Sequence, residues 1–142
     1  MLSQTSEYAL RATLFLAMHG SEGPVKLERV SEALEVPRNY LSKTLHQLAR
    51  AGVLTSERGP HGGFRLSTPP EHLTLARIVE PFDPARLARR CLLGKGECSD
   101  STPCAAHERW KVVADPLRAF FRSTTVADLI QGTATMPVES AV

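Results

Sequence analysis

Residues 36–67 read VPRNYLSKTLHQLARAGVLTSERGPHGGFRLS, and this stretch decides which fold the sequence predicts. Its first half carries leucines three or four residues apart, as one face of a helix requires: Leu41, Leu45 and Leu48. Pro37 precedes them at a position where the first turn of a helix tolerates proline, and the period stops before Gly52. We therefore expect a helix that begins near Pro37 and ends before Gly52.

The second half of the stretch predicts a β-hairpin. Residues 53–56 and 64–67 are short runs that can form strands, and the turn-rich insert RGPHGG at 58–63 separates them. Upstream, apolar residues at helical spacing predict one helix over about 5–19 and a shorter one over 27–36. Two short helices joined by a tight turn indicate a helix-turn-helix, and the hairpin that follows them is a wing.

The C-terminal third predicts a helix that packs against a partner helix. From residue 106, apolar residues advance by alternating steps of four and three, and we name this series the seam: Ala106, Trp110, Val113, Leu117 and Phe120. Such spacing is typical of paired helices, so this helix is the predicted dimer element. Pro116 falls inside it and is expected to kink or break it. Thr74 is expected to cap a brief helix at 75–79, and residues 125–128 resemble a capping box before a last short helix.

Together these elements predict a mainly α-helical protein with a small β-hairpin, namely a winged helix-turn-helix plus a long C-terminal dimerisation helix. The winged helix-turn-helix takes residues 1–70, and a linker helix with a cysteine loop takes 71–104. The dimerisation helix and a short terminal helix take 105–131, before a frayed tail at 132–142. The apolar run at 8–18 is interrupted by an arginine and has no basic segment before it, so we expect a cytoplasmic protein without a signal peptide or membrane span.

The helix after Pro37 presents polar side chains opposite its leucines. In a helix-turn-helix the second helix enters the major groove, where Asn, Arg and Lys pair with purine edges and Ser or Tyr contacts phosphate. A glycine-rich wing with an exposed arginine suits a minor groove, whose negative potential attracts guanidinium. The predicted contacts to a double-stranded DNA operator are Arg38, Asn39, Tyr40, Ser42, Lys43, His46, Arg58 and His61. The alternative is a solvated polar face beside an ordinary hairpin, and the net charge of +2 does not decide between the two.

Three cysteines and a histidine lie close together in the sequence after the wing. Cys91, Cys98 and Cys104 are separated by six and five residues, and His107 follows three positions later. A reducing cytoplasm disfavours disulfides, whereas thiolates bind soft metals and iron-sulfur clusters. The spacing differs from the paired CxxC of zinc ribbons, which makes zinc less favoured. The segment therefore indicates a metal or cluster site, with a metal-free thiol switch or three unligated cysteines as alternatives.

With these residues in view, the chain resembles the Rrf-two family of winged-helix iron-sulfur transcriptional regulators over nearly all of residues 1–131. The likeness rests on four groups of residues: YAL at 8–10, YL at 40–41, RGPHGGF at 58–64, and the three cysteines with His107 and Trp110. It implies a homodimer whose long C-terminal helices pair. It also implies a cluster whose redox state, nitrosylation or loss alters the affinity for DNA.

The resemblance also implies a ligand set. Members of the IscR type use three cysteines and a histidine that matches His107, and GKG at 94–96 is similar to their loop, which favours a 2Fe-2S over a 4Fe-4S cluster. The six residues between Cys91 and Cys98 depart from the five expected for that type. Members of the NsrR type recruit an acidic residue at the position of Glu7 from the other subunit, so Glu7 is the alternative fourth ligand. A carboxylate near a helix N-terminus is also favourable without any metal.

The function predicted from these observations is DNA-binding transcriptional regulation, with the protein acting as a repressor. Its operator affinity would be controlled by an iron-sulfur cluster that senses redox state, nitric oxide or iron-sulfur status. The alternatives are a cluster-free thiol-switch regulator and a zinc-stabilised protein-interaction module. No Ser-His-Asp or phosphate-loop arrangement accompanies the cysteines, so an enzyme is not expected.

Overall fold

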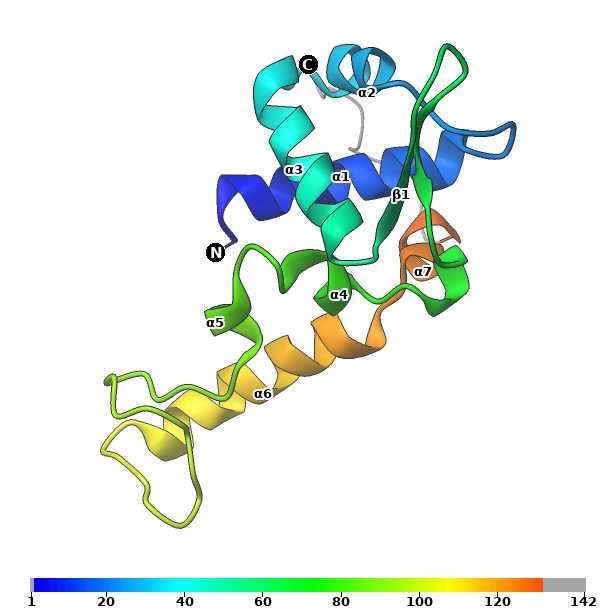
Figure 1. Cartoon of the computed structure of the whole chain (residues 1–142). Coiled ribbons are helices and arrows are strands. Elements are labelled where there is room, and N and C mark those ends of the chain that lie inside the picture. The colour runs from blue at the N-terminus through cyan, green and yellow to red at the C-terminus, as the bar shows by residue number, and fades with distance from the viewer. Residues whose placement is uncertain (1, 132–142) are drawn as a thin grey trace.

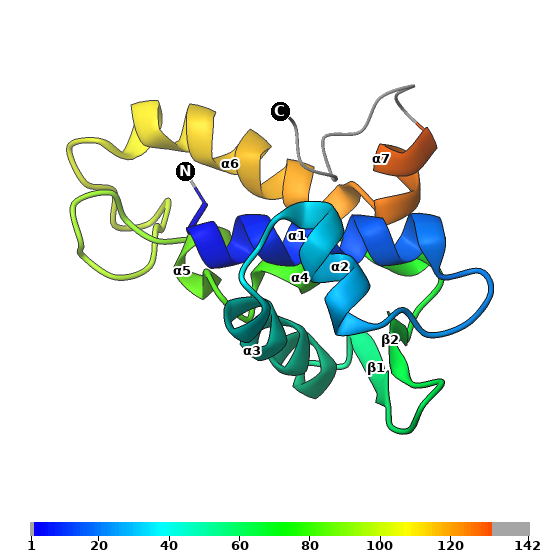
Figure 2. The same ribbon diagram turned by 90° about the horizontal axis from the view of Figure 1, so that it is seen from above.

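The computed structural model describes residues 2–131 of the 142-residue chain, and Figures 1 and 2 show its path. In chain order the elements are α1 (Gln4–His19), α2 (Leu27–Leu34), α3 (Arg38–Arg50), β1 (Leu54–Glu57), β2 (Gly63–Leu66), the 3-10 turn η1 (Pro70–His72), α4 (Leu75–Val79), α5 (Pro84–Leu87), α6 (His107–Ser123) and α7 (Val126–Gln131). The predicted tail at 132–142 lies outside the described residues. None of the helices within the described part of the chain combines the length and the apolarity that crossing a membrane requires.

Helices α1, α2 and α3 form the predicted helix-turn-helix around a shared core. Helix α1 packs against α2, α3, α4 and α7, and the leucine face of α3 is fully buried. The chain turns between α2 and α3 at Glu35, which adopts the left-handed conformation with φ 53°. The N–H of Val36 then donates to the carbonyl of Ser31 at 3.2 Å, which closes the turn. Helix α3 begins at Arg38, directly after Pro37, as the sequence predicts.

The wing is the antiparallel pair β1 and β2, with Leu54 opposite Leu66. Its strands are offset by one residue from the predicted ones. The turn between them needs glycine at position 62, because a Cβ there would lie 2.2 Å from the carbonyl oxygen of Glu57. Val25 and Phe64 exchange two backbone hydrogen bonds, of 2.9 and 2.8 Å, which anchor the wing to the segment before α2.

The local caps predicted downstream are confirmed. The hydroxyl of Thr74 accepts from the N–H of Arg77 at 3.4 Å and opens α4. Thr125 and Asp128 form a reciprocal capping box before α7: the N–H of Thr125 donates to the Asp128 carboxylate at 2.9 Å, and the N–H of Asp128 donates to the Thr125 hydroxyl at 3.1 Å.

Helix α6 runs without interruption through Pro116, so of the two effects expected of this residue, a kink or a break, the break is wrong. Proline removes one backbone hydrogen bond, the bond that would have ended on the carbonyl of Val112. Both residues are exposed, so water can satisfy that carbonyl. The C-terminal end of α6 is also anchored by Phe121, which is 9% exposed and belongs to the main core.

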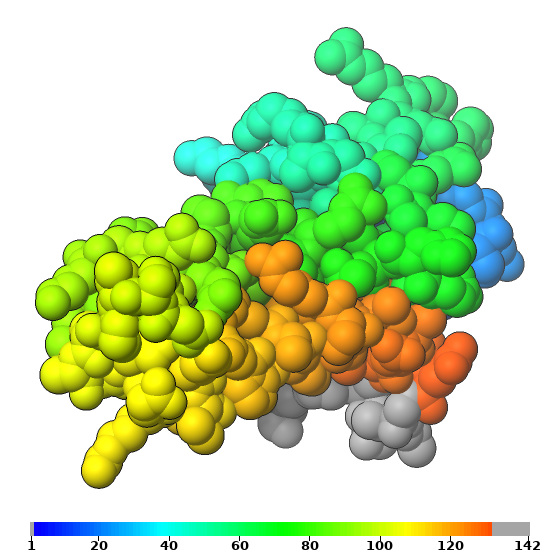
Figure 3. Space-filling model, turned by 90° about the horizontal axis from the view of Figure 1, so that it is seen from below, coloured from blue at the N-terminus to red at the C-terminus, as the bar shows by residue number. Residues whose placement is uncertain are grey.

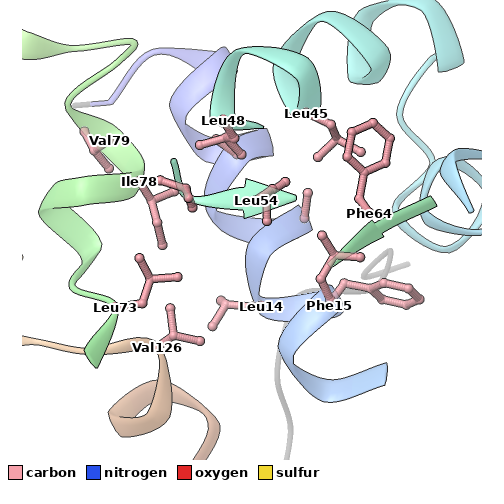
Figure 4. Close-up of a cluster of buried hydrophobic side chains, with 14 of the residues drawn as sticks. Leu14, Phe15, Leu45, Leu48, Leu54, Phe64, Leu73, Ile78, Val79 and Val126 are labelled. Atoms are coloured by element: carbon pink, nitrogen blue, oxygen red, sulfur yellow. The ribbon is translucent and has the colours of Figure 1, made fainter. Parts of the chain in front are cut away.

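The core and the cysteine loop occupy different parts of the molecule. Figure 4 shows buried side chains from α1, α3, the wing, α4 and α7 converging, among them Leu14, Leu48, Leu54, Ile78 and Val126. The cysteine loop leads into the N-terminal end of α6, and this end of the helix lies away from the core (Figure 1). In the space-filling view of Figure 3 this loop forms a lobe at one end of the molecule. The wing tip and the cysteine loop lie at opposite ends (Figures 1 and 2).

Candidate functional site

The polar face of α3 is open to solvent on the side away from the core. Arg38, Asn39, Lys43 and His46 are exposed, and Tyr40 retains 40% exposure while Ser42 is half-buried. The sequence predicted these six side chains as possible DNA contacts, because they lie opposite the leucines of the same helix. A helix with such a face, presented next to an exposed hairpin, has the shape and chemistry to enter a DNA groove.

Several of these side chains already have partners within the chain. The Arg38 guanidinium lies 2.5 Å from the carboxylate of Glu28 on α2, with both groups solvent-exposed. The Nδ1–H of His46 donates to the carbonyl of Ser42 at 2.8 Å, and its ring meets that of Phe64 edge-on at 5.2 Å. His46 therefore links the polar face of α3 to the wing.

The wing tip carries the remaining predicted DNA contacts. Arg58 and His61 are both exposed in the turn between β1 and β2. Arg65, on β2, is instead paired with the Glu57 carboxylate at 3.0 Å. Of the two arginines that flank the wing turn, Arg58 is thus the one without an ion pair among the described residues.

The cysteine loop before α6 is shaped by backbone hydrogen bonds. The N–H of Cys91 donates to the carbonyl of Gly96 at 2.8 Å, and the N–H of Cys98 donates to the carbonyl of Arg89 at 2.8 Å. Gly96 has a φ of 91°, a conformation that favours glycine. The indole N–H of Trp110 donates to the carbonyl of Arg90 at 3.1 Å and ties the loop to α6.

The structure brings the three cysteines and His107 together around one cavity of about 340 Å³. They meet as two close pairs. The sulfurs of Cys91 and Cys104 are 3.4 Å apart, and the Cys98 sulfur is 3.3 Å from Nδ1 of His107. Cys98 and His107 are buried, with 7% and 2% exposure, while Cys91 and Cys104 are half-buried free thiols.

Hydrogen bonds at the cavity favour the ionised form of Cys91 and of the neighbouring Asp100. The backbone N–H groups of Lys95 and Leu93 donate to the Cys91 sulfur and lower the pKa of that thiol below its ordinary value. The carboxylate of Asp100 accepts from Lys111 at 2.8 Å and contacts Nε2 of His107 at 2.9 Å. Its bonds to Lys111, and then to His107, lower the pKa of Asp100 to about 2. Asp100 is therefore a carboxylate throughout the physiological range.

Sequence reasoning missed Asp100 and Lys111. The available signal was weak: Asp100 follows Cys98 by two positions, and Lys111 lies one helical turn after His107 on α6.

The structure does not bring Glu7 to the cavity of its own chain. Glu7 is exposed on the first turn of α1 and is absent from the residues that line the cavity. Within residues 2–131, no three His, Cys, Asp or Glu side chains converge as ligands of a single metal ion.

Comparison with known proteins places nearly all of the chain in one family. The sequence profile of the Rrf2 family, described as an iron-dependent transcriptional regulator, matches residues 2–132. The chain is 36% identical over 132 residues to an HTH-type transcriptional regulator of Aquifex aeolicus, covering 92% of this chain and 91% of that protein. It is 31% identical over 129 residues to the HTH-type transcriptional regulator IscR of Aliivibrio salmonicida, covering 91% and 76% of the two chains.

Solved structures agree with the sequence comparison. The structure of CymR, the global cysteine regulator of B. subtilis, superposes with a TM-score of 0.79 at 26% identity, and the match covers 94% of this chain and 98% of that one. The family and the two relatives in sequence are transcriptional regulators, which confirms the prediction that the chain is not an enzyme. The exposed polar face of α3, the wing and the family match lead to the same conclusion: this chain belongs to the Rrf2 family and is a winged-helix, DNA-binding transcriptional regulator.

Proposed function

We propose that this regulator, acting as a repressor in the cytoplasm, controls its DNA binding through an iron-sulfur cluster held by Cys91, Cys98, Cys104 and His107. The observation that carries the proposal is the meeting of these four side chains around one cavity as two pairs, at 3.4 and 3.3 Å. Each iron of a 2Fe-2S cluster takes two protein ligands, whereas a 4Fe-4S cluster takes one ligand at each of four irons. The paired arrangement therefore favours 2Fe-2S.

The chemistry of the donor set fits such a group. Thiolates and imidazole are ligands that iron-sulfur clusters accept, and the lowered pKa of Cys91 favours its thiolate form. When bound, the cluster would supply a centre that responds to redox state, nitric oxide or iron-sulfur supply. The burial of Cys98 and His107 keeps water from one pair of ligands, while Cys91 and Cys104 remain accessible to small molecules.

DNA would be contacted by the exposed side chains of α3 and the wing. The proposed contacts are Arg38, Asn39, Tyr40, Ser42, Lys43, His46, Arg58 and His61. A homodimer would present two such surfaces to one operator, with α6 of each chain packed against the other. The seam supports this pairing, because Val113, Leu117 and Phe120 are 60%, 40% and 48% exposed in the single chain.

The cysteine loop is joined to the dimer helix directly. His107 is the first residue of α6, so a change in its ligation would act at the start of the helix that carries the seam. A coupling of about 1 to 3 kcal/mol between the state of the cluster and the binding of DNA would change operator affinity about 5- to 150-fold.

A second candidate is a thiol switch without a cluster. The 3.4 Å contact between the Cys91 and Cys104 sulfurs favours it, as does the fold shared with the cysteine regulator CymR. In this case peroxide would oxidise the two thiols to a disulfide and would itself be reduced to water.

One preparation separates the candidates. The full-length protein is purified without oxygen, reconstituted with iron and sulfide, and analysed for iron, sulfide and zinc alongside its visible spectrum. We expect a brown protein that contains iron and sulfide in equal amounts and that nitric oxide bleaches. The Cys98→Ala variant should be colourless. Failure to take up iron and sulfide, with a Cys91–Cys104 disulfide after peroxide, would favour the thiol switch. Bound zinc without iron would favour a structural metal site.

A further inference from the structure

The side chain of Asp100 makes a contact that the four predicted ligands do not explain. Its Oδ1 lies 2.9 Å from Nε2 of His107, on the opposite edge of the imidazole from the Cys98 sulfur, which lies 3.3 Å from Nδ1. The imidazole is therefore held between a carboxylate and a thiol. Its own exposure is 2%, so neither ring nitrogen is turned toward bulk water.

The two contacts assign different roles to the two ring nitrogens. A carboxylate only accepts hydrogen bonds, so Nε2 must carry the proton in this contact. A neutral imidazole has one N–H, which leaves Nδ1 with a free electron pair on the side of Cys98. An imidazole ligand binds a metal through an unprotonated nitrogen, and its other nitrogen commonly donates to a carboxylate that fixes the ring orientation.

Asp100 is itself held in place by cationic groups. The Lys111 ammonium donates to the same Oδ1 at 2.8 Å, and the Arg89 guanidinium lies 3.9 Å from Oδ2. Lys111 is one turn after His107 on α6, so the helix positions both the imidazole and the cation that retains its carboxylate. The turn around Asp100 is closed locally, because the N–H of Ser101 donates to the Ser99 hydroxyl at 3.2 Å.

We propose that Asp100 is a positioning residue of the cluster site, which fixes His107 so that Nδ1, and not Nε2, is the ligand atom. This inference rests on the proposed function, because it assigns a role toward the cluster. A purely structural role for Asp100 would have different consequences, because an exposed ion pair with Lys111 would add little to stability and nothing to the ligand geometry. Loss of such a supporting carboxylate lowers metal affinity about tenfold to a hundredfold in known sites.

The test compares the wild type with Asp100→Ala, Asp100→Asn and Glu108→Ala. Glu108 is the matched control, because it is an exposed carboxylate beside His107 on α6 and makes none of the hydrogen bonds or ion pairs found around the cavity. Asp100→Asn retains an acceptor oxygen and so tests whether acceptance from Nε2 is sufficient. Circular dichroism of each metal-free variant checks that it is folded.

Two measurements read the ligand geometry without any assay of DNA binding. The first is the rate at which a chelator removes iron from the reconstituted protein, at matched iron and sulfide content. The second is pulsed electron paramagnetic resonance of the reduced cluster in protein labelled with ¹⁵N only at Nδ1 of histidine. We expect strong coupling to Nδ1 in the wild type, and iron loss about tenfold or more faster in Asp100→Ala. Asp100→Asn should lie between them, and Glu108→Ala should match the wild type.

The outcomes separate this inference from the proposed function. A wild type that takes up the cluster but shows no strong coupling to Nδ1 overturns the assignment of the ligand atom and leaves the cluster proposal standing. The same holds if Asp100→Ala loses iron as slowly as Glu108→Ala. A wild type that takes up neither iron nor sulfide overturns both.

Discussion

The hydroxyl of Tyr40, near the start of α3, lies 2.5 Å from the hydroxyl of Thr5, near the start of α1. The Tyr40 ring also meets the Tyr8 ring edge-on at 5.5 Å, so the end of α3 that is predicted to read DNA is tied to the first turns of α1. The same turn of α1 is bound on its other side by Asp83, whose carboxylate accepts from the N–H of Ser3 and the hydroxyl of Ser6. The start of α1 therefore joins α3 to the segment that leads into the cysteine loop.

Tyr40→Phe should test the first of these links. It retains the ring that packs on Tyr8 and removes the hydrogen bond to Thr5, so we expect the free energy of unfolding to fall by about 1 kcal/mol. Denaturant unfolding measures the change. Tyr8→Phe is the control, because its hydroxyl accepts from Gln4 one turn away on the same helix and joins no two elements, so it should have a smaller effect. A Tyr40→Phe protein as stable as the wild type would contradict a stabilising role for the link.

Asp83→Asn should give a stability difference that depends on pH. Partial burial raises the pKa of Asp83, but the hydrogen bonds from Ser6 and Ser3 outweigh it and hold the pKa below its ordinary value. A carboxylate whose pKa is lower in the folded than in the unfolded state stabilises the fold above the unfolded pKa of about 3.9, and loses this effect as pH falls through the folded pKa.

For Asp83→Asn we therefore expect a loss of about 1 kcal/mol at pH 7 that shrinks as the pH falls below about 4. Thermal unfolding across this pH range measures it. The lowered pKa of Asp100 is present in both the wild type and Asp83→Asn, so its contribution to the free energy of unfolding cancels when the two are compared. Glu22→Gln, in the exposed loop after α1, is the control and should show no such trend. A difference that is constant from pH 7 to pH 2.5 would mean that the charge of Asp83 is not what stabilises the fold.

Arg58→Ala should weaken DNA binding without changing the iron content. If the Arg58 guanidinium contacts one phosphate, its loss reduces the slope of log K against log salt by about 0.9. Fluorescence anisotropy with duplex DNA over a range of salt concentrations measures this slope. Arg65→Ala should change it less, because that guanidinium is already paired with Glu57. Equal slopes for the wild type and Arg58→Ala would remove Arg58 from the DNA interface.

Val113→Lys should dissociate the proposed dimer. Val113 belongs to the seam, and placing an unpaired ammonium in a helix interface costs several kcal/mol, which raises the dimer dissociation constant by about tenfold or more. Sedimentation velocity measures the effect. Val112→Lys is the matched control, since Val112 is an adjacent valine with 74% exposure that lies outside the seam. If both variants dissociate equally, or neither does, the seam is not the dimer interface.

Local signals in the sequence accounted for most of the fold. The leucine period of α3, the glycines of the wing and the capping box at 125–128 each specify a backbone conformation through residues close in the chain, and the structure confirms all three. The sequence did not decide between a kink and a break at Pro116, and α6 is not broken there, because whether a lost hydrogen bond breaks a helix depends on solvent access and on how the helix end is packed.

By itself, the sequence determined a winged helix-turn-helix, a seam on a C-terminal helix and a cysteine-rich loop, because helical periods, turn glycines and short spacings act over only a few residues. The tertiary structure alone decided which of these groups meet. It placed Cys91 against Cys104 and Cys98 against His107, brought Asp100 to the imidazole, and joined Tyr40 to Thr5 across 35 positions. Such pairs form only when the loop closes and the helices pack, so no local sequence pattern predicts them.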